Sequence, residues 1–234
     1  MTAADTRPVP TGVPESVPRP AVVVGSTAAG DGLIGRLRAR GMSVGHVDPC
    51  TAVSPAAAFD AVVADLGTPG LVVVAHLDPA AAAAGPLVEL DPAQWDAAGE
   101  RSIRVAIQVM QEVHRHLPDD GRVVVVLPSV ATVGVPGLVP MCTAVEAIRV
   151  MAKVAARRWG ARGITVNTVL VPLAAFLGDA TPPGAAVPSL GAASLPDHEA
   201  LDDAAGLVAM LAGPDGGALT GATLGADAGT VMQP

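Results

Sequence analysis

The residues best placed for chemistry in this chain follow short runs of valine. Gly25, Gly30 and Gly32 follow the first run, and glycines in such a turn let the amides at the start of a helix approach a phosphate group. His76 follows a second valine run and Ser129 a third. An imidazole can exchange a proton near neutral pH, and a hydroxyl can hold a ligand oxygen. The pattern predicts a ligand site where several strands end, with a turn histidine and an idle serine as the structural alternatives.

Two further residues also have a functional and a structural interpretation. Asp48 follows another apolar run, where a carboxylate can accept a hydrogen bond from a ribose hydroxyl, but Asp48-Pro49 is at least as typical of a turn. Cys142 opens an expected helix, where the helix dipole lowers the pKa of a thiol, although most cysteines in apolar surroundings only fill space. No residues stand at the spacing of a metal site, and we expect no bound metal.

Six apolar runs predict strands that are covered on both faces. They are rich in valine and do not alternate with polar residues, which is typical of the central strands of parallel sheets. Helical stretches separate them, and strands alternating with helices predict an α/β fold with a doubly wound parallel sheet. The expected strands are residues 21–25, 43–48, 71–75, 122–127, 164–171 and 222–226.

Composition limits the domain organisation and the classes of partner. Residues 1–20 contain prolines at short intervals and predict a disordered tail, which leaves 21–234 as a single domain. The net charge of −8 argues against nucleic acid and anionic membranes as partners, because both need a basic face. No apolar run is long enough to span a bilayer and no signal peptide is recognisable, so we expect a cytoplasmic protein.

Two stretches, 97–117 and 141–159, show the heptad-like spacing of helices that pack along their length. The second is apolar most of the way round, which is typical of a helix buried on two sides. One apolar side of this helix can pack against the sheet. The apolar residues on its other side indicate contact with a second subunit. The regularly spaced residues are Ile103, Ala106, Met110, Val113 and Leu117 in the first, and Val145, Ile148, Ala152, Ala155 and Trp159 in the second.

Four segments together resemble the short-chain dehydrogenase/reductase family, and most closely its ketoreductase (3-oxoacyl-ACP reductase-like) branch. The segment 22–32 resembles the family's glycine-rich turn, and 121–131 resembles the strand that ends in its catalytic serine. The segments 162–169 and 219–229 resemble its last two strands. The resemblance covers about residues 21–232 and implies a Rossmann-like fold.

The family's catalytic machinery does not carry over to this chain. The resemblance implies a tyrosine that donates the proton and a lysine that lowers the pKa of that tyrosine. It also implies a serine that orients the carbonyl and an asparagine that holds a water. Ser129 stands at the serine position and Ser102 at the asparagine position, while Met141 and Val145 replace the tyrosine and the lysine. The chain has no tyrosine at all. Lys153 lies about 12 Å further along the helix and cannot take over.

The cofactor that the resemblance implies is NAD(P). Gly25, Gly30 and Gly32 would hold its pyrophosphate, and Asp48 its ribose. The turn is one residue longer than the family pattern, however, and Asp31 places a negative charge near the pyrophosphate position. We therefore expect no bound cofactor, with NAD(P) as the alternative.

The region around the adenine pocket is also shortened. Only one helix, 55–66, fits between Asp48 and the next strand, where relatives place a further helix and strand. The third-strand edge region is therefore expected to be missing, which leaves six strands. His76 stands where the family has a glycine that lets the cofactor pass.

Three functional hypotheses follow. In the first, a redox-inactive family member forms a homo- or hetero-oligomer with an SDR-like subunit through helices 97–117 and 141–159. In the second, a repurposed enzyme with His76, Ser129 and Ser102 as candidate catalytic residues performs a non-redox step on a hydrophobic acyl or polyketide-like ligand. Met141 and Val145 would line the apolar pocket of that enzyme. In the third, a residual NAD(P)-dependent reductase persists. We favour the first.

Overall fold

The computed structural model describes residues 19–50, 54–182, 193–195 and 198–232. Within them, six parallel strands form one sheet, as predicted, and the strand order is β2-β1-β3-β4-β5-β6. The chain first builds outward to β2 and then returns to β3 on the other side of β1, and such a reversal leaves a crevice at the carboxyl ends of the two strands. The strands are β1 (Ala21–Val24), β2 (Val44–Val47), β3 (Leu71–Val74), β4 (Arg122–Pro128), β5 (Thr165–Val171) and β6 (Thr223–Gly225).

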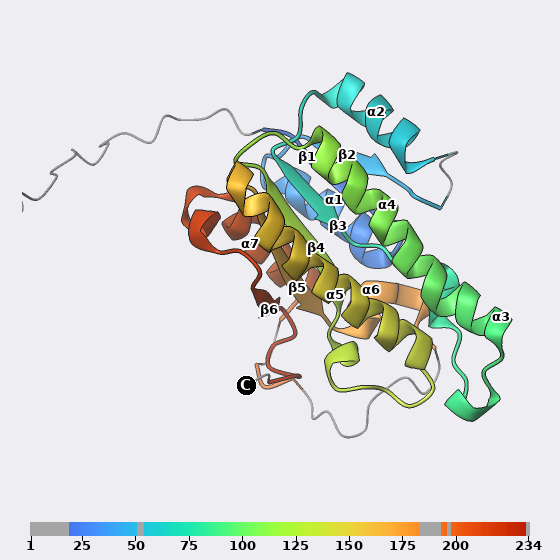
Figure 1. The fold of residues 1–234 in the computed structure, drawn as a ribbon. Coiled ribbons are helices and arrows are strands. Elements are labelled where there is room, and N and C mark those ends of the chain that lie inside the picture. Colours follow the sequence, from blue (N-terminus) through green and yellow to red (C-terminus); the bar gives the residue numbers. More distant parts are fainter. Residues whose placement is uncertain (1–18, 51–53, 183–192, 196–197, 233–234) are drawn as a thin grey trace, which may run out of the picture.

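Helices cover both faces of the sheet (Figure 1). On one face α1 contacts both α6 and α7, and on the other α4 lies between α2 and α5. Phe59 and Phe176 are completely buried, and the rest of the core is built mainly from alanine, valine and leucine. The helices are α1 (Ala28–Ala39), α2 (Pro55–Leu66), α3 (Pro92–Trp95), α4 (Arg101–His116), α5 (Val139–Trp159), α6 (Leu173–Leu177) and α7 (Ala200–Ala212).

The predicted loss of an edge element is confirmed for the described residues, because α2 alone connects β2 to β3 and no strand pairs with the outer side of β2. A free strand edge exposes unpaired carbonyl groups. Arg38 reduces this exposure, since its Nη2 donates to the carbonyl oxygen of Val44 over 2.8 Å. The predicted tail, residues 1–20, lies outside the described residues except for its last two positions.

Local sequence explains where several helices begin. The Asp91 side chain accepts from the Gln94 amide over 2.8 Å, and the Gln94 side chain accepts from the Asp91 amide over 3.0 Å, which is the predicted capping box. Thr27 and Ser54 cap α1 and α2 in a similar way, since each side chain accepts a hydrogen bond from the amide three residues later.

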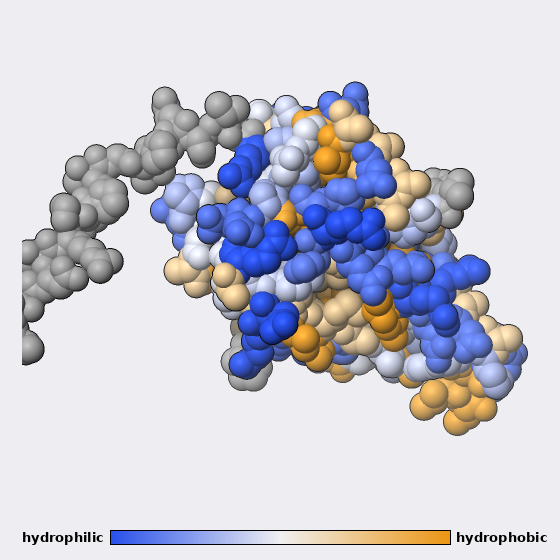
Figure 2. Space-filling model, turned by 45° about the horizontal axis from the view of Figure 1, so that its top comes forward, coloured by the Kyte–Doolittle hydropathy of each residue, from blue (hydrophilic) through white to orange (hydrophobic). Residues whose placement is uncertain are grey.

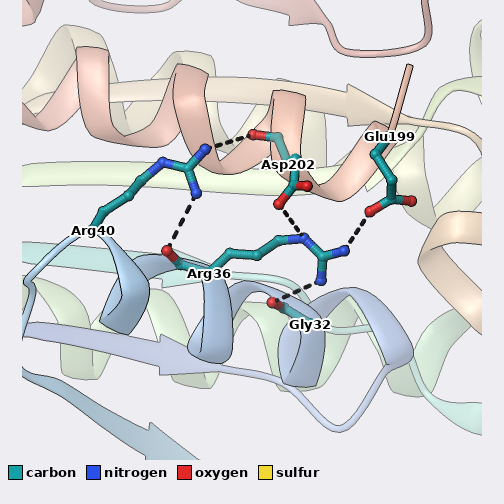
Figure 3. A network of polar contacts seen from close by, with 5 residues as sticks. All are labelled: Gly32, Arg36, Arg40, Glu199 and Asp202. Atoms are coloured by element: carbon teal, nitrogen blue, oxygen red, sulfur yellow. Dashed lines mark hydrogen bonds and ion pairs between the residues drawn. The ribbon is translucent and has the colours of Figure 1, made fainter. Parts of the chain in front are cut away.

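An ion-pair network ties α1 to the start of α7 (Figure 3). The Arg36 guanidinium donates to Asp202 over 2.7 Å and also binds the carboxylate of Glu199. A further nitrogen of Arg36 donates to the carbonyl oxygen of Gly32 over 3.3 Å, and Arg40 donates to the carbonyl oxygen of Asp202 over 3.1 Å. The network fixes α7 beside the glycine turn that precedes and opens α1.

The two long helices that were predicted to pack along their length lie side by side on the outer layer. The predicted range 97–117 begins inside a π-helical turn, Asp96–Glu100, that precedes α4, and α5 begins at Val139 rather than 141. The sheet-facing sides are buried, whereas Val150 and Val154 on α5 are 52% and 61% exposed. The half of α5 that faces away from the sheet therefore keeps an apolar stripe without a partner in the described chain.

Among the described residues, none of the helices is both long and apolar enough to cross a bilayer.

Candidate functional site

Contacts within the protein shape the glycine turn between β1 and α1. Gly25 has a φ of +153°, and a Cβ atom there would lie 2.1 Å from the carbonyl oxygen of Ala75. Thr27 Oγ1 donates to that same oxygen over 2.8 Å and accepts from the amide of Gly30 over 3.3 Å. The turn is thus bound to the end of β3, directly beside His76.

The other two glycines of the turn also face protein atoms. A Cβ atom at Gly30 would lie 3.2 Å from the carbonyl oxygen of Gly25, and one at Gly32 would lie 2.6 Å from Cδ1 of Leu201 on α7. Gly25 is therefore required by the fold itself, because its close neighbour is backbone, whereas the neighbour of Gly32 is the end of a flexible side chain. Asp31 adds an exposed negative charge in the first turn of α1, where a phosphate would bind. This charge disfavours a phosphate at the start of α1.

His76 is a buried histidine whose ring has no hydrogen-bond partner among the described residues. Its side chain is 3% exposed, and neither Nδ1 nor Nε2 is satisfied. Burial lowers the pKa of His76, while the charges of Asp78 and, to a lesser degree, Asp48 act in the opposite direction. The imidazole is therefore neutral near pH 7, with one nitrogen that could accept a proton. Such a group in the crevice beside β1 is a candidate acid or base.

The lowered pKa of His76 predicts a specific pH dependence of stability. The unfolded chain binds the proton near the ordinary histidine pKa of about 6.5, so the stability that neutral His76 contributes is complete above that pH and is lost as the pH falls below it. Between about pH 7 and about pH 5, we expect the melting temperature of His76→Leu to fall by less than that of the wild type. Thermal melts at the two pH values measure this difference.

The exposed His114 on α4 offers a matched control. His114→Leu is expected to keep the wild-type pH dependence. If His76→Leu and His114→Leu shift the dependence equally, the buried neutral state of His76 is disproved.

The end of β2 holds Asp48 together with a histidine that the sequence analysis did not single out. The Asp48 carboxylate accepts from the amide of Cys50 over 2.8 Å, which is the contact expected of a turn residue. His46 Nε2 donates to the carbonyl oxygen of Gly25 over 2.7 Å and so supports the glycine turn from the other side. The only sequence signal for His46 was a polar residue within a short apolar run.

Ser102 has a structural contact at the position of the family's asparagine. It is completely buried, and its hydroxyl accepts from the amide of Asp78 over 2.9 Å. Asp78 in turn accepts from the amide of Ala80 over 2.9 Å and lies 3.6 Å from Nη1 of Arg101. The chain that leaves β3 is thereby fixed to the start of α4. Asp78 was missed at the sequence level, where its signal was an Asp-Pro pair at the start of a turn.

Ser129 lies at the start of the short helical turn that follows β4, and it is buried. Met141 and Val145, in the first two turns of α5, expose no surface at all. The expectation that these two side chains line an accessible apolar pocket is therefore wrong, because the core packs around them. A cavity of about 360 Å³ lies instead between the segment after β3 and α3, and its lining includes none of these three residues.

Cys142 lies in the first turn of α5. Burial raises the pKa of its thiol and outweighs the backbone contact at Val135, which acts in the opposite direction. The hypothesis of a thiol activated by the helix dipole is therefore wrong. Burial destabilises the thiolate by more than the start of the helix stabilises it. The space-filling interpretation accounts for this residue.

Comparisons with solved structures agree on the fold. The chain is similar to a blue fluorescent protein from a metagenomic library in complex with NADPH, at 24% identity and a TM-score of 0.72, over 91% of this chain and 98% of that one. It is also similar to a dehydrogenase/reductase from Sinorhizobium meliloti, at 24% identity and a TM-score of 0.73, over 90% and 94% of the two chains. A short-chain dehydrogenase from Burkholderia cenocepacia in complex with NADP matches at 24% identity and a TM-score of 0.72, over 90% and 97%.

Sequence comparison gives the family. Among curated proteins, none matches this chain significantly. A family model described as enoyl-(acyl carrier protein) reductase matches residues 24–231, which is nearly all of the chain. Together with the six-stranded parallel sheet, this match shows that the chain belongs to the short-chain dehydrogenase/reductase family.

Proposed function

We propose that this protein is a member of the family that does not reduce carbonyl groups by the tyrosine route and that serves as a subunit beside an SDR-like partner. The observation that carries the proposal is the absence of tyrosine from the whole chain. At the positions that correspond to the tyrosine and the lysine stand Met141 and Val145, both completely buried. Methionine has no proton to donate, and valine has no charge that could lower the pKa of a proton donor.

The outer layer of helices supports the role as a subunit. Val150 and Val154 expose an apolar stripe on α5, and a groove of about 500 Å³ lies between α4 and α5. Exposed apolar surface rimmed by polar residues is typical of protein–protein contacts. Both cysteines are free thiols, which suits the reducing cytoplasm in which we place the protein.

The unpartnered ring of His76 favours a second candidate, an enzyme that performs a non-redox step on a hydrophobic acyl or polyketide-like molecule. In it, His76 would exchange a proton with the substrate during cyclisation, isomerisation or dehydration. The substrate would have to reach the crevice between β1 and β3. This candidate requires His76→Ala to abolish turnover.

Structural neighbours in complex with NADPH or NADP favour a third candidate, a residual NAD(P)-dependent reductase. Against it stands the negative charge of Asp31 in the first turn of α1. If a dinucleotide does bind, its phosphates would lie at the start of α1 and it would supply the hydride. This chain's own residues would still have to supply the proton.

Calorimetric titration with NADH and NADPH tests the first candidate against the third. We expect no heat beyond dilution at cofactor concentrations up to about 1 mM, because Asp31 places a negative charge in the first turn of α1, where the phosphates would bind. An intact family member titrated in the same buffer is the control. A dissociation constant below about 0.1 mM would establish cofactor binding and favour the third candidate.

A further inference from the structure

The basic residues of this acidic protein are concentrated on two helices. Of the 14 lysine and arginine residues in a chain of net charge −8, seven lie on α4 and α5, beside only two acidic residues, which gives these helices a formal net charge of +5. The remainder of the chain is correspondingly acidic. In Figure 2, strongly hydrophilic residues cover much of the side on which these helices lie, with apolar residues among them.

Several of these cations have no acidic partner within the described chain. Four of the seven have one: Arg101 lies 3.6 Å from Asp78, Arg104 3.8 Å from Glu100 and Arg115 3.0 Å from Glu112, and Arg149 binds Glu146. Lys153, Arg157 and Arg158 are exposed, and no ion pair holds any of them among the described residues. They lie in the second half of α5, where the helix dipole adds negative potential but supplies no partner of its own.

One of the unpaired cations, Arg158, lines the apolar groove between the two helices, and Lys153 and Arg157 lie on the same helix, α5. Ile107 and Val154, both partly exposed, line this groove from α4 and α5, and Arg158 and His114 lie at its rim. An apolar centre bordered by charge is the arrangement of a protein interface, in which the rim selects the partner and the centre supplies affinity. A nucleic acid is disfavoured as the occupant, because apolar side chains hold the centre of the face.

A second copy of this chain fits the face poorly. A two-fold axis brings the same face of both subunits together, wherever on the face that axis passes. Two helix pairs of net charge +5 would then meet, and like charges brought together at an interface cost free energy. A partner whose matching helices are acidic meets the same apolar groove without this cost.

We infer that the α4–α5 face binds a different subunit of the same fold, one that carries a net acidic pair of helices around an apolar stripe. The inference rests on the proposed role as a subunit and adds the identity of the partner by charge. It accounts for the accumulation of half of all cations of the chain on two helices.

The chain itself can supply a test partner. In the variant Arg104→Glu/Lys153→Glu/Arg157→Glu/Arg158→Glu, the formal charge of the two helices changes from +5 to −3. We expect sedimentation velocity to show that wild type and variant form a mixed dimer at least about tenfold tighter than the wild-type self-association at low salt. Rising salt should weaken the mixed dimer and strengthen wild-type self-association, because it screens both charge effects.

The control variant Ala39→Glu/Ala64→Glu/Thr68→Glu adds acidic charge at exposed positions away from the two helices and should pair with the wild type no better than wild type does. Should the fourfold variant fail to melt cooperatively, Lys153→Glu/Arg157→Glu replaces it, since both side chains are exposed.

The possible failures are distinct. The acidic partner alone is overturned if wild type dimerises as tightly as the mixture and salt does not strengthen the wild-type dimer. It is also overturned if wild type binds duplex DNA as tightly as it binds the variant. Absence of any association in wild type and in the mixture overturns the subunit role as well.

Discussion

Replacing Gly25 with alanine is expected to destabilise the protein by about 3 kcal/mol or more. The added Cβ would lie 2.1 Å from the Ala75 carbonyl oxygen, which is backbone and cannot turn aside. The φ of +153° is also unfavourable for any residue with a side chain. In a chain of this length such a loss lowers the melting temperature by roughly 6 °C or more. Thermal unfolding followed by circular dichroism measures it.

Gly35 is the matched control in the helix that follows the turn. A Cβ atom there would meet nothing within 4 Å, so Gly35→Ala is expected to stabilise α1 by up to about 1 kcal/mol. If the two alanine variants melt at the same temperature, the close approach of the turn to β3 is wrong. A folded Gly25→Ala protein of wild-type stability would contradict it in the same way.

Much of the fold could be predicted from the sequence because its determinants are local. Unbroken valine runs are covered strands wherever helices flank them, and all six were located within one or two residues. Helix α2 has the predicted bounds, Pro55–Leu66, since Ser54 caps its start and Gly67 ends it. The start of α5 was placed two residues too late, because Pro140 suits a first helical turn but does not by itself reveal where that turn begins.

The candidate site was less predictable because its contacts join distant segments. The contact of Leu201 with Gly32 places α7 against the glycine turn. The spacing of residues within the turn does not predict this contact. The hydrogen bond from the Asp78 amide to the Ser102 hydroxyl is also a contact between distant segments, since it joins the chain after β3 to α4. Burial also decided between the two interpretations of Cys142, because it raises the pKa of the thiol. Residue types at strand ends indicate where a site lies, but which of their atoms are already occupied depends on tertiary packing.

Carbonyl reduction is expected to be slow even when both NADPH and a ketone are supplied in excess. A positioned acid contributes about 10²–10⁴-fold to such a reaction, and this chain contains no tyrosine to provide one. The only lysine, Lys153, is exposed on the far side of α5 from the core. We therefore expect a rate at least about 10²-fold below that of an intact family member. Ser129→Ala should leave any residual rate unchanged, because orienting a carbonyl has no effect where no proton follows.

The most direct test is NADPH oxidation, followed by absorbance, on a set of ketones of different sizes. Wild type, Ser129→Ala and an intact family member are measured side by side at equal concentration. The missing proton donor predicts rates for the first two that are equal to each other and at least about a hundredfold below the third. A wild-type rate within about tenfold of the intact enzyme that falls sharply in Ser129→Ala would show that another acid serves the family's route.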